Sequence, residues 1–251
     1  MDYNKYSNQW INKRKSGTHF AHDYLEKPAM MDKLSNLENL DVLVLGCGSG
    51  EELEFILKSK PKKVIAVDSS KELIKVAEFN FPTVQFIVSK LEDLEFENQT
   101  FDYIFSSLTF HYIKDWISLF NTLNSWLKPR GKILFSTHHP IKWGAKINKN
   151  NLFNEFTLGY KKDKKDDTQF QIYGDYLGFN KVQYKLFDKL DIIYYNRPIS
   201  QMFSEITQNN LQIIDIIEPK PILESAKIKP DFYEVYSKIP LFLILEIQKT
   251  K

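Results

Sequence analysis

The sequence predicts a single doubly wound α/β domain built on a mostly parallel, seven-stranded sheet. Five strand-like runs alternate with helical periods between Asp41 and Phe135, most of these runs are continuously apolar, and a glycine-rich turn follows the first of them. Strands that are apolar throughout are typical of a sheet covered by helices on both faces. We expect residues 1–40 to form a helical lid outside the sheet and residues 41–251 to form the main domain.

The first five strands are expected at "DVLVLG", "KVIAVD", "VQFIV", "FDYIFS" and "GKILFS". Between them, residues 51–59, 70–80 and 115–127 carry apolar residues at three- and four-residue spacing, which is the helical period. The alternation then stops, and we interpret residues from about 141 to 197 as an inserted cap that contains short strands at "YGDYLGFN" and "KLDIIYYNRP". A helix at "PISQMFSEITQNN" leads to two further strands, "LQIIDIIEP" and "PLFLILEIQK", which can complete the sheet.

The composition argues against several classes of partner. The 34 Lys and Arg residues nearly balance the 32 Asp and Glu residues, so no strong field is available to attract nucleic acid or anionic lipid. The longest apolar run, "IPLFLILEI", is far shorter than the roughly 20 residues that a membrane-spanning helix needs. The single cysteine, Cys47, cannot form an internal disulfide, and the first residues lack the apolar core of a secretory signal. We expect a cytoplasmic protein with neither a nucleic-acid nor a membrane partner; its oligomeric state is not predicted.

The turn "GCGSG" is the most informative motif in the chain. Gly46, Gly48 and Gly50 permit a sharp strand-to-helix turn and let the backbone approach a ligand closely. Alone, such a turn can be an ordinary loop, because glycine is common in loops of every kind. Here a second strand ends at Asp68, about 20 residues further on, where an acid in this type of sheet accepts the hydroxyls of a ribose. The motif therefore indicates a nucleoside-containing ligand.

The residues after the turn distinguish between two kinds of nucleoside ligand. A dinucleotide rests its pyrophosphate on the helix N-terminus and uses the spacing G-x-G-x-x-G. This chain has G-x-G-x-G, and Glu51 and Glu52 occupy the first helical turn. Carboxylates suit the positive end of a helix dipole but repel a pyrophosphate. We expect a ligand with a ribose and no phosphate near the turn.

"VLVLGCGSG" followed by "VIAVDSS" resembles the opening of a class I S-adenosylmethionine-dependent methyltransferase of the small-molecule, type 11-like group. The similarity continues through "LEDLEFENQTFDYIFSSLTFHYIKDW" and "LKPRGKILFSTHHP", and covers Asp41 to about Pro140. The resemblance implies a Rossmann-like methyltransferase fold, S-adenosylmethionine as cofactor and S-adenosylhomocysteine as product. It also implies transfer of a methyl group to an oxygen, nitrogen or carbon nucleophile of a small organic molecule.

The resemblance assigns roles to matching positions. The residues that it implies for cofactor binding are Gly46, Cys47, Gly48, Gly50, Asp68, Ser69, Leu73, Leu91, Glu92 and Ser106. Two positions depart from the pattern: Val44 stands where relatives often carry an acid, and Lys90 stands where many carry an acid that binds the adenine amino group. Either Glu92 or a main-chain carbonyl could substitute for the second acid, or adenine affinity is reduced.

Candidate catalytic residues should follow strands four and five, because ligands of an open α/β sheet bind at the carboxyl ends of its strands. His111 follows the fourth strand and is the first candidate for an acid-base role. His138 and His139 follow the fifth, and since adjacent strand residues point to opposite faces, at most one should face the cleft. We select His139, next to Pro140; for each histidine, packing in a loop is the alternative.

Substrate-lining candidates come from the N-terminal segment and the insertion: Tyr6, Trp10, Arg14, His19, Tyr195 and Arg197. The N-terminal aromatic residues could close over the cleft as a lid, or simply pack on the sheet domain. His19 and His22 are three residues apart, but three metal ligands with defined spacing are absent, and no metal site is predicted.

Two other function classes stay open on the sequence alone. A dinucleotide-dependent oxidoreductase would require the helix N-terminus to accept a pyrophosphate beside Glu51 and Glu52. A methyltransferase-like module that binds a ligand or a partner without turnover is the alternative motivated by Val44 and Lys90.

Overall fold

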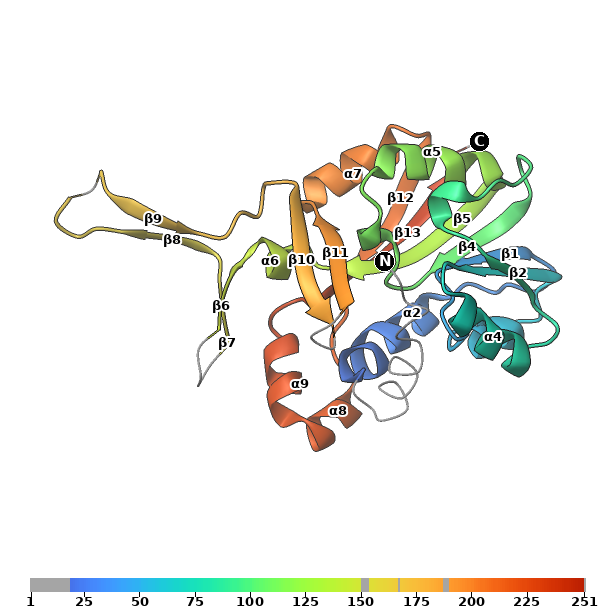
Figure 1. The fold of residues 1–251 in the computed structure, drawn as a ribbon, viewed down its shortest axis with the longest axis horizontal. Coiled ribbons are helices and arrows are strands. Elements are labelled where there is room, and N and C mark those ends of the chain that lie inside the picture. The colour runs from blue at the N-terminus through green and yellow to red at the C-terminus, as the bar shows by residue number, and fades with distance from the viewer. Residues whose placement is uncertain (1–18, 150–153, 167, 187–189, 251) are drawn as a thin grey trace.

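A computed structural model describes residues 19–149, 154–166, 168–186 and 190–250 of the chain. Its centre is a seven-stranded sheet with the strand order β12-β13-β5-β4-β1-β2-β3 (Figure 1). These strands are β1 (Asp41–Leu45), β2 (Lys63–Asp68), β3 (Gln85–Val88), β4 (Phe101–Ser106), β5 (Leu127–His138), β12 (Leu211–Ile217) and β13 (Phe242–Lys249). The pairs formed among β1 to β5 are parallel, and β13 runs antiparallel to both β5 and β12. The predicted fold class is confirmed.

Helices cover both faces of this sheet. They are α2 (Lys27–Lys33), α3 (Leu53–Lys58), α4 (Lys71–Asn80), α5 (Trp116–Trp126) and α7 (Ile199–Thr207). Alternate residues of β1 pack on opposite sides: Leu43 and Leu45 belong to the core cluster under α5 and α7, whereas Val42 and Val44 belong to the cluster under α2, α3 and α4. The continuously apolar strands of the sequence are therefore explained by burial on both faces.

The inserted cap follows β5 and consists of one short helix and three two-stranded sheets. Its elements are α6 (Pro140–Gly144), β6 (Lys146–Lys149), β7 (Asn154–Thr157), β8 (Gly159–Lys162), β9 (Phe170–Tyr173), β10 (Asn180–Leu186) and β11 (Leu190–Asn196). The β10–β11 pair lies against the sheet domain, while β8 and β9 form an arm that extends away from it (Figure 1). The strand predicted at residues 173–180 is wrong in its central part. Residues 174–179 form a loop, in which Gly174 has a φ of 77°.

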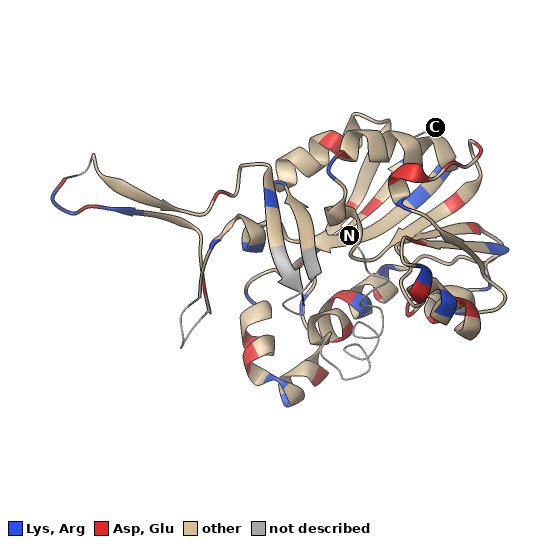
Figure 2. Ribbon diagram, in the orientation of Figure 1, with Lys and Arg blue, Asp and Glu red and all other residues tan. Residues whose placement is uncertain are grey.

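Two helices that the sequence analysis did not predict, α8 (Leu223–Ile228) and α9 (Pro230–Tyr236), connect β12 to β13. They contact the start of the described chain, where the Phe20 and Phe232 rings meet edge to face at 5.0 Å and Ile222 N donates to Tyr24 O at 2.9 Å. Basic and acidic residues are interspersed over the molecule in this view, including the tip of the β8–β9 arm (Figure 2). None of the described helices is long and apolar enough to cross a membrane.

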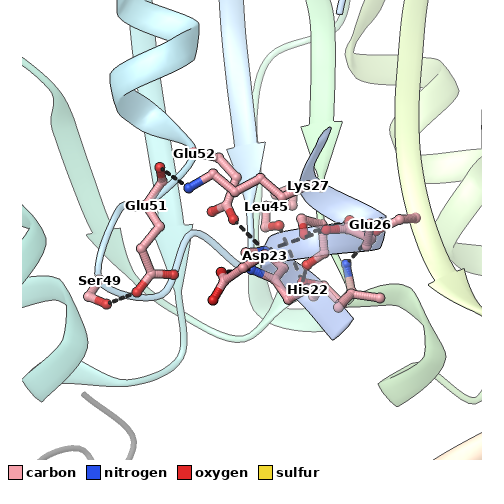
Figure 3. Close-up of polar contacts among 12 residues, drawn as sticks. His22, Asp23, Glu26, Lys27, Leu45, Ser49, Glu51 and Glu52 are labelled. Atoms are coloured by element: carbon pink, nitrogen blue, oxygen red, sulfur yellow. Dashed lines mark hydrogen bonds and ion pairs between the residues drawn. The ribbon is translucent and has the colours of Figure 1, made fainter. Parts of the chain in front are cut away.

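A buried ionic network holds the N-terminal helix over the sheet domain. His22 begins a π-helical segment, η2 (His22–Glu26), and its Nε2 donates to Glu52 Oε1 at 2.9 Å (Figure 3). Its Nδ1 lies 3.2 Å from Asp23 Oδ1, and its Nε2 lies 3.4 Å from Glu26 Oε2. Burial by itself lowers the pKa of His22, but the hydrogen bonds to Asp23 and Glu52 and the charge of Glu26 outweigh it and raise the pKa to about 9. The imidazole is therefore a cation at neutral pH.

This network predicts a pH dependence of stability. A histidine whose folded pKa exceeds its unfolded value of about 6.5 stabilises the fold fully below pH 6.5, and this stabilisation is lost as the pH rises through about 9. The unfolding free energy of the wild type, relative to that of His22→Gln, should fall by an amount on the order of 3 kcal/mol across this window. Urea denaturation of both proteins between pH 6 and about 9.5 measures the difference. A difference that stays constant with pH would contradict the role assigned to His22.

Candidate functional site

The glycine-rich turn joins β1 to α3 at the carboxyl edge of the sheet. Gly46, Gly48 and Gly50 have φ angles of 72°, 53° and 89°, a region in which only glycine is free of strain. A Cβ atom on Gly46 would lie 2.0 Å from Thr109 Oγ1, so this glycine lets the segment after β4 pack on the turn. A Cβ atom on Gly48 would meet no atom of the described residues within 4 Å. The backbone at Gly48 is therefore open to a ligand.

Asp68 ends β2 beside this turn. Its Oδ2 accepts a hydrogen bond from Gly48 N at 2.9 Å, and its Oδ1 accepts one from Ser70 N at 2.8 Å. An ionised carboxylate offers about four lone-pair positions, so Asp68 can accept hydroxyl groups in addition. Ser89 N, just after β3, donates to Asp68 O at 3.0 Å. The acid thus lies between the turn and the ends of two strands, as a ribose-binding residue requires.

Cys47 lies inside the turn and is buried. Burial raises the pKa of its thiol well above the ordinary value, and the charges of Asp68 and Glu52 raise it further. The thiol is therefore protonated at neutral pH, and thiols of this kind are not nucleophiles. Cys47 serves as a small apolar residue beside the cleft.

The other residues predicted to bind the cofactor differ in exposure. Ser69 is exposed after β2, and Leu73 is buried in the first turn of α4. Leu91 is half-buried and Glu92 is exposed, both in the short helix η3 (Leu91–Asp93) that follows β3. Ser106, the last residue of β4, is fully buried, and its Oγ donates to Leu45 O at 3.0 Å. The Ser106 hydroxyl thus joins β4 to β1.

A buried carboxylate that the sequence analysis missed, Glu26, lies at the same edge of the sheet. Its Oε1 accepts hydrogen bonds from Ser107 Oγ at 2.9 Å and from Ser136 Oγ, residues that belong to the ends of β4 and β5. Burial raises the pKa of Glu26, although the positive charge of His22 and the Ser136 hydrogen bond oppose this shift. The sequence signal that could have indicated the pair is the spacing of His22 and Glu26, four residues apart on a helix.

A small aromatic pocket lies next to this carboxylate, where β11 of the cap covers the ends of β4 and β5. Its walls are formed by His111, Thr137, His138, Trp143, Tyr194, Tyr195, Asn196 and Met202. The rings of His111 and His138 stack with centroids 4.2 Å apart, and Trp143 stacks on the far side of His138 at 5.3 Å. Tyr194 stands edge-on to both histidines at 4.8 Å.

Both histidines of the pocket are neutral. Burial lowers the pKa of His111 well below its ordinary value, with a smaller contribution from His138. Burial also lowers the pKa of His138 to about 3, and the nearby charge of Lys142 adds to this shift. Neither imidazole can hold a second proton near neutral pH, so their chemistry is limited to hydrogen bonding and stacking.

The structure corrects the choice between the two adjacent histidines. His138, the last residue of β5, lines the pocket, whereas His139, the N-cap of α6, is not among the lining residues. His139 Nδ1 accepts a hydrogen bond from Ile141 N at 3.2 Å, and its Nε2 bonds to Glu218 Oε1 at 2.8 Å. His139 therefore caps α6, and the histidine that lines the pocket is His138.

The other residues predicted to line the substrate site, besides Arg197, are Tyr195, His19, Tyr6, Trp10 and Arg14. Tyr195 lines the pocket, and His19 is half-buried at the start of the described chain. Tyr6, Trp10 and Arg14 lie outside the described residues.

Arg197, predicted to line the acceptor pocket, is instead fully buried in the interior. Its guanidinium lies 4.3 Å from the Trp116 ring centroid, its Nη2 donates to Lys114 O at 2.8 Å, and its Nε pairs with Glu205 at 3.0 Å. These contacts tie the end of the cap to α5 and α7. Arg197 is not among the residues that form the pocket walls.

The turn and the pocket are connected by one short segment. Thr109 packs on Gly46 and its near neighbour His111 enters the pocket, so a ligand over the turn and a ligand in the pocket would meet at the end of β4. Three carboxylates, Glu26, Glu52 and Asp68, gather along this edge with the protonated His22 among them. Such an edge suits a cationic ligand and repels a diphosphate. No group of three or more side chains within the described ranges is arranged to hold a metal ion.

Comparisons with known proteins agree with this geometry. The model of a family described as a methyltransferase domain matches residues 43–135. A malonyl-[acyl-carrier protein] O-methyltransferase from Halalkalibacterium halodurans is 40% identical over 106 residues, which make up 39% of each chain. An uncharacterized protein from Haemophilus influenzae is 28% identical over 232 residues, covering 88% of this chain and 86% of its own.

A crystal structure of an S-adenosylmethionine-dependent methyltransferase from Mesorhizobium loti has the same fold, with a TM-score of 0.71 and 22% identity over 88% of this chain and 96% of its own. This similarity covers more of the chain than residues 43–135 alone. Residues 43–135 therefore match a methyltransferase domain, and the fold of the chain is that of S-adenosylmethionine-dependent methyltransferases of known structure.

Proposed function

We propose that the protein transfers the methyl group of S-adenosylmethionine to a nucleophilic oxygen, nitrogen or carbon atom of a small organic molecule held in the His111–His138 pocket. The observation that carries this proposal is the adjacency of an open glycine turn, with Asp68 beside it, to a small aromatic pocket. The cap makes the pocket small, which favours a small acceptor or one end of a larger one.

The cofactor would lie along the carboxyl ends of β2, β1 and β4. Asp68 would accept the ribose hydroxyls, Leu91 and Glu92 would border the adenine, and the open backbone at Gly48 would accommodate the tail. When bound, the cofactor supplies a methyl group activated by a positively charged sulfur. Glu26 and Glu52 would favour this cation at the reacting end, because unlike charges attract strongly where water is excluded.

The chain's own contribution to the reaction is alignment of the two reactants and exclusion of water. His111 and His138 would orient the acceptor by hydrogen bonds and ring contacts. Neither would take up a proton near neutral pH, because burial lowers the pKa of both imidazoles. Residues 19–40 would act as a lid, and the hydrogen bond between His22 and Glu52 would hold this segment against the sheet domain.

Ligand binding tests the cofactor site directly. S-adenosylhomocysteine should bind in isothermal titration calorimetry, whereas NAD should not, because a diphosphate would meet Glu52 and Glu26. Asp68→Asn should weaken binding about tenfold or more, since it removes a charged hydrogen-bond acceptor. Gly48→Ala should also weaken binding while costing only about 1 kcal/mol of stability from its positive φ. Glu78→Gln, an exposed change on α4, is the matched control.

Binding of NAD in preference to S-adenosylhomocysteine, or no binding of either by the folded protein, would defeat the proposed function.

The ionisation of the pocket histidines is a separate prediction. The ring proton resonances of His111 and His138 should show no titration midpoint near 6.5, because burial lowers the pKa of His111 well below its ordinary value and that of His138 to about 3. Histidine-selective NMR spectra recorded between about pH 5 and 8 measure this, and His111→Gln and His138→Gln assign the two signals. A titration midpoint near 6.5 for either ring would show that it can serve as a general base.

A further inference from the structure

Four buried polar atoms around the aromatic pocket have no hydrogen-bond partner within the described part of the chain. They are His111 Nδ1, His138 Nδ1, Trp143 Nε1 and Asn196 Nδ2, and all four residues line the pocket. Buried polar atoms are rarely left without partners, because the loss of hydration costs free energy. Trp143 Nε1 and Asn196 Nδ2 carry hydrogens and can only donate. A group that presents hydrogen-bond acceptors would satisfy these donors, and the pocket is so small that only one end of a larger molecule would enter it.

A cation lies directly behind this wall. Lys142 Nζ is 5.4 Å from the centroid of the Trp143 ring and 5.6 Å from that of Phe156, and its charge acts on His138. Burial lowers the pKa of Lys142, and no acidic side chain among the described residues forms an ion pair with it. A partly buried ammonium that only aromatic rings stabilise gains free energy from an anion within reach of its flexible side chain.

The acceptor must also be a nucleophile that requires no base from the pocket. The two imidazoles are neutral and poor proton acceptors, and Glu26, the nearby carboxylate, is engaged by Ser107, Ser136 and His22 and does not line the pocket. An alcohol or a phenol would have to lose a proton during transfer. A carboxylate is already ionised at neutral pH and presents acceptor oxygens only.

We propose that the methyl acceptor is a carboxylate, bound by Trp143, Asn196 and Lys142, and that the product is a methyl ester. This inference rests on the proposed function and narrows its acceptor. One carboxylate oxygen attacks the methyl carbon, the new C–O bond forms as the C–S bond breaks, and the sulfur keeps the electron pair of the broken bond. The carboxylate loses its charge, the sulfonium becomes a neutral thioether, and no proton is released.

Binding of matched probes tests the acceptor class. With the protein saturated by S-adenosylhomocysteine, phenylacetate should bind about tenfold or more tightly than phenylacetamide, which has the same shape without the charge. Lys142→Met should remove most of this preference, and Trp143→Phe, which keeps the ring and removes the N–H donor, should reduce it. Lys146→Met is the matched control, because Lys146 lies over the Tyr173 ring but is exposed on β6 outside the pocket.

A transfer assay supplies the second readout. The protein is incubated with S-adenosylmethionine carrying a tritiated methyl group and an equimolar mixture of phenylacetate, hexanoate, 4-ethylphenol and phenethylamine. Label that mild alkali releases as methanol identifies a methyl ester and supports the proposal, whereas alkali-stable label identifies an ether or amine and overturns it.

No preference for carboxylate in either assay, by a protein that binds S-adenosylhomocysteine, overturns the acceptor assignment and leaves the proposed function standing. Failure to bind S-adenosylhomocysteine overturns the proposed function itself.

Discussion

The backbone conformation of the turn after β1 is the constraint on which the candidate site depends. Three glycines with positive φ let the chain reverse without Cβ atoms, so Thr109 can pack on Gly46 while Gly48 N donates to Asp68. These two contacts bring the ends of β1, β2 and β4 together at one edge of the sheet. A side chain at Gly46 would push Thr109 away and with it the segment that carries His111 into the pocket.

The electrostatics of this edge explain which ligand it can accept. Glu26 and Glu52 are buried, and burial of carboxylates is unfavourable unless they are paired. His22 supplies the compensating charge and comes from the N-terminal helix, so closure of the helix over the sheet and neutralisation of the edge are one event. A cationic sulfonium fits beside such a set of charges. The neutral imidazoles of the neighbouring pocket contrast with this charged edge.

Much of this arrangement follows from the sequence, and the missing parts have physical reasons. The strands up to β5 were predicted because burial on both faces gives each strand a continuous run of apolar residues, and such a run can be recognised in the sequence. The position of Asp68 beside the glycine turn was predictable because both follow adjacent parallel strands. Glu26 was missed because its partners, Ser107 and Ser136, are more than 80 residues away in the chain, and nothing local indicates that the N-terminal helix covers the sheet edge.

Errors in the pocket have a similar origin. His138 ends β5 and lines the pocket, whereas His139 caps α6, so the choice between them depended on the exact end of the strand, which sequence patterns locate poorly. Arg197 was predicted to line the acceptor pocket, yet its guanidinium lies over the Trp116 ring and pairs with Glu205 in the interior. The helices between β12 and β13 are short and carry only a weak amphipathic pattern.

A crystal structure of the protein with S-adenosylhomocysteine is the measurement that tests the central claim most directly. The account predicts the ribose hydroxyls on Asp68, the tail along the backbone of Gly48, and the sulfur at the end of β4, facing the His111–His138 pocket. Ligand bound elsewhere, or a cleft that stays closed by the protein's own side chains at saturating ligand, would contradict it.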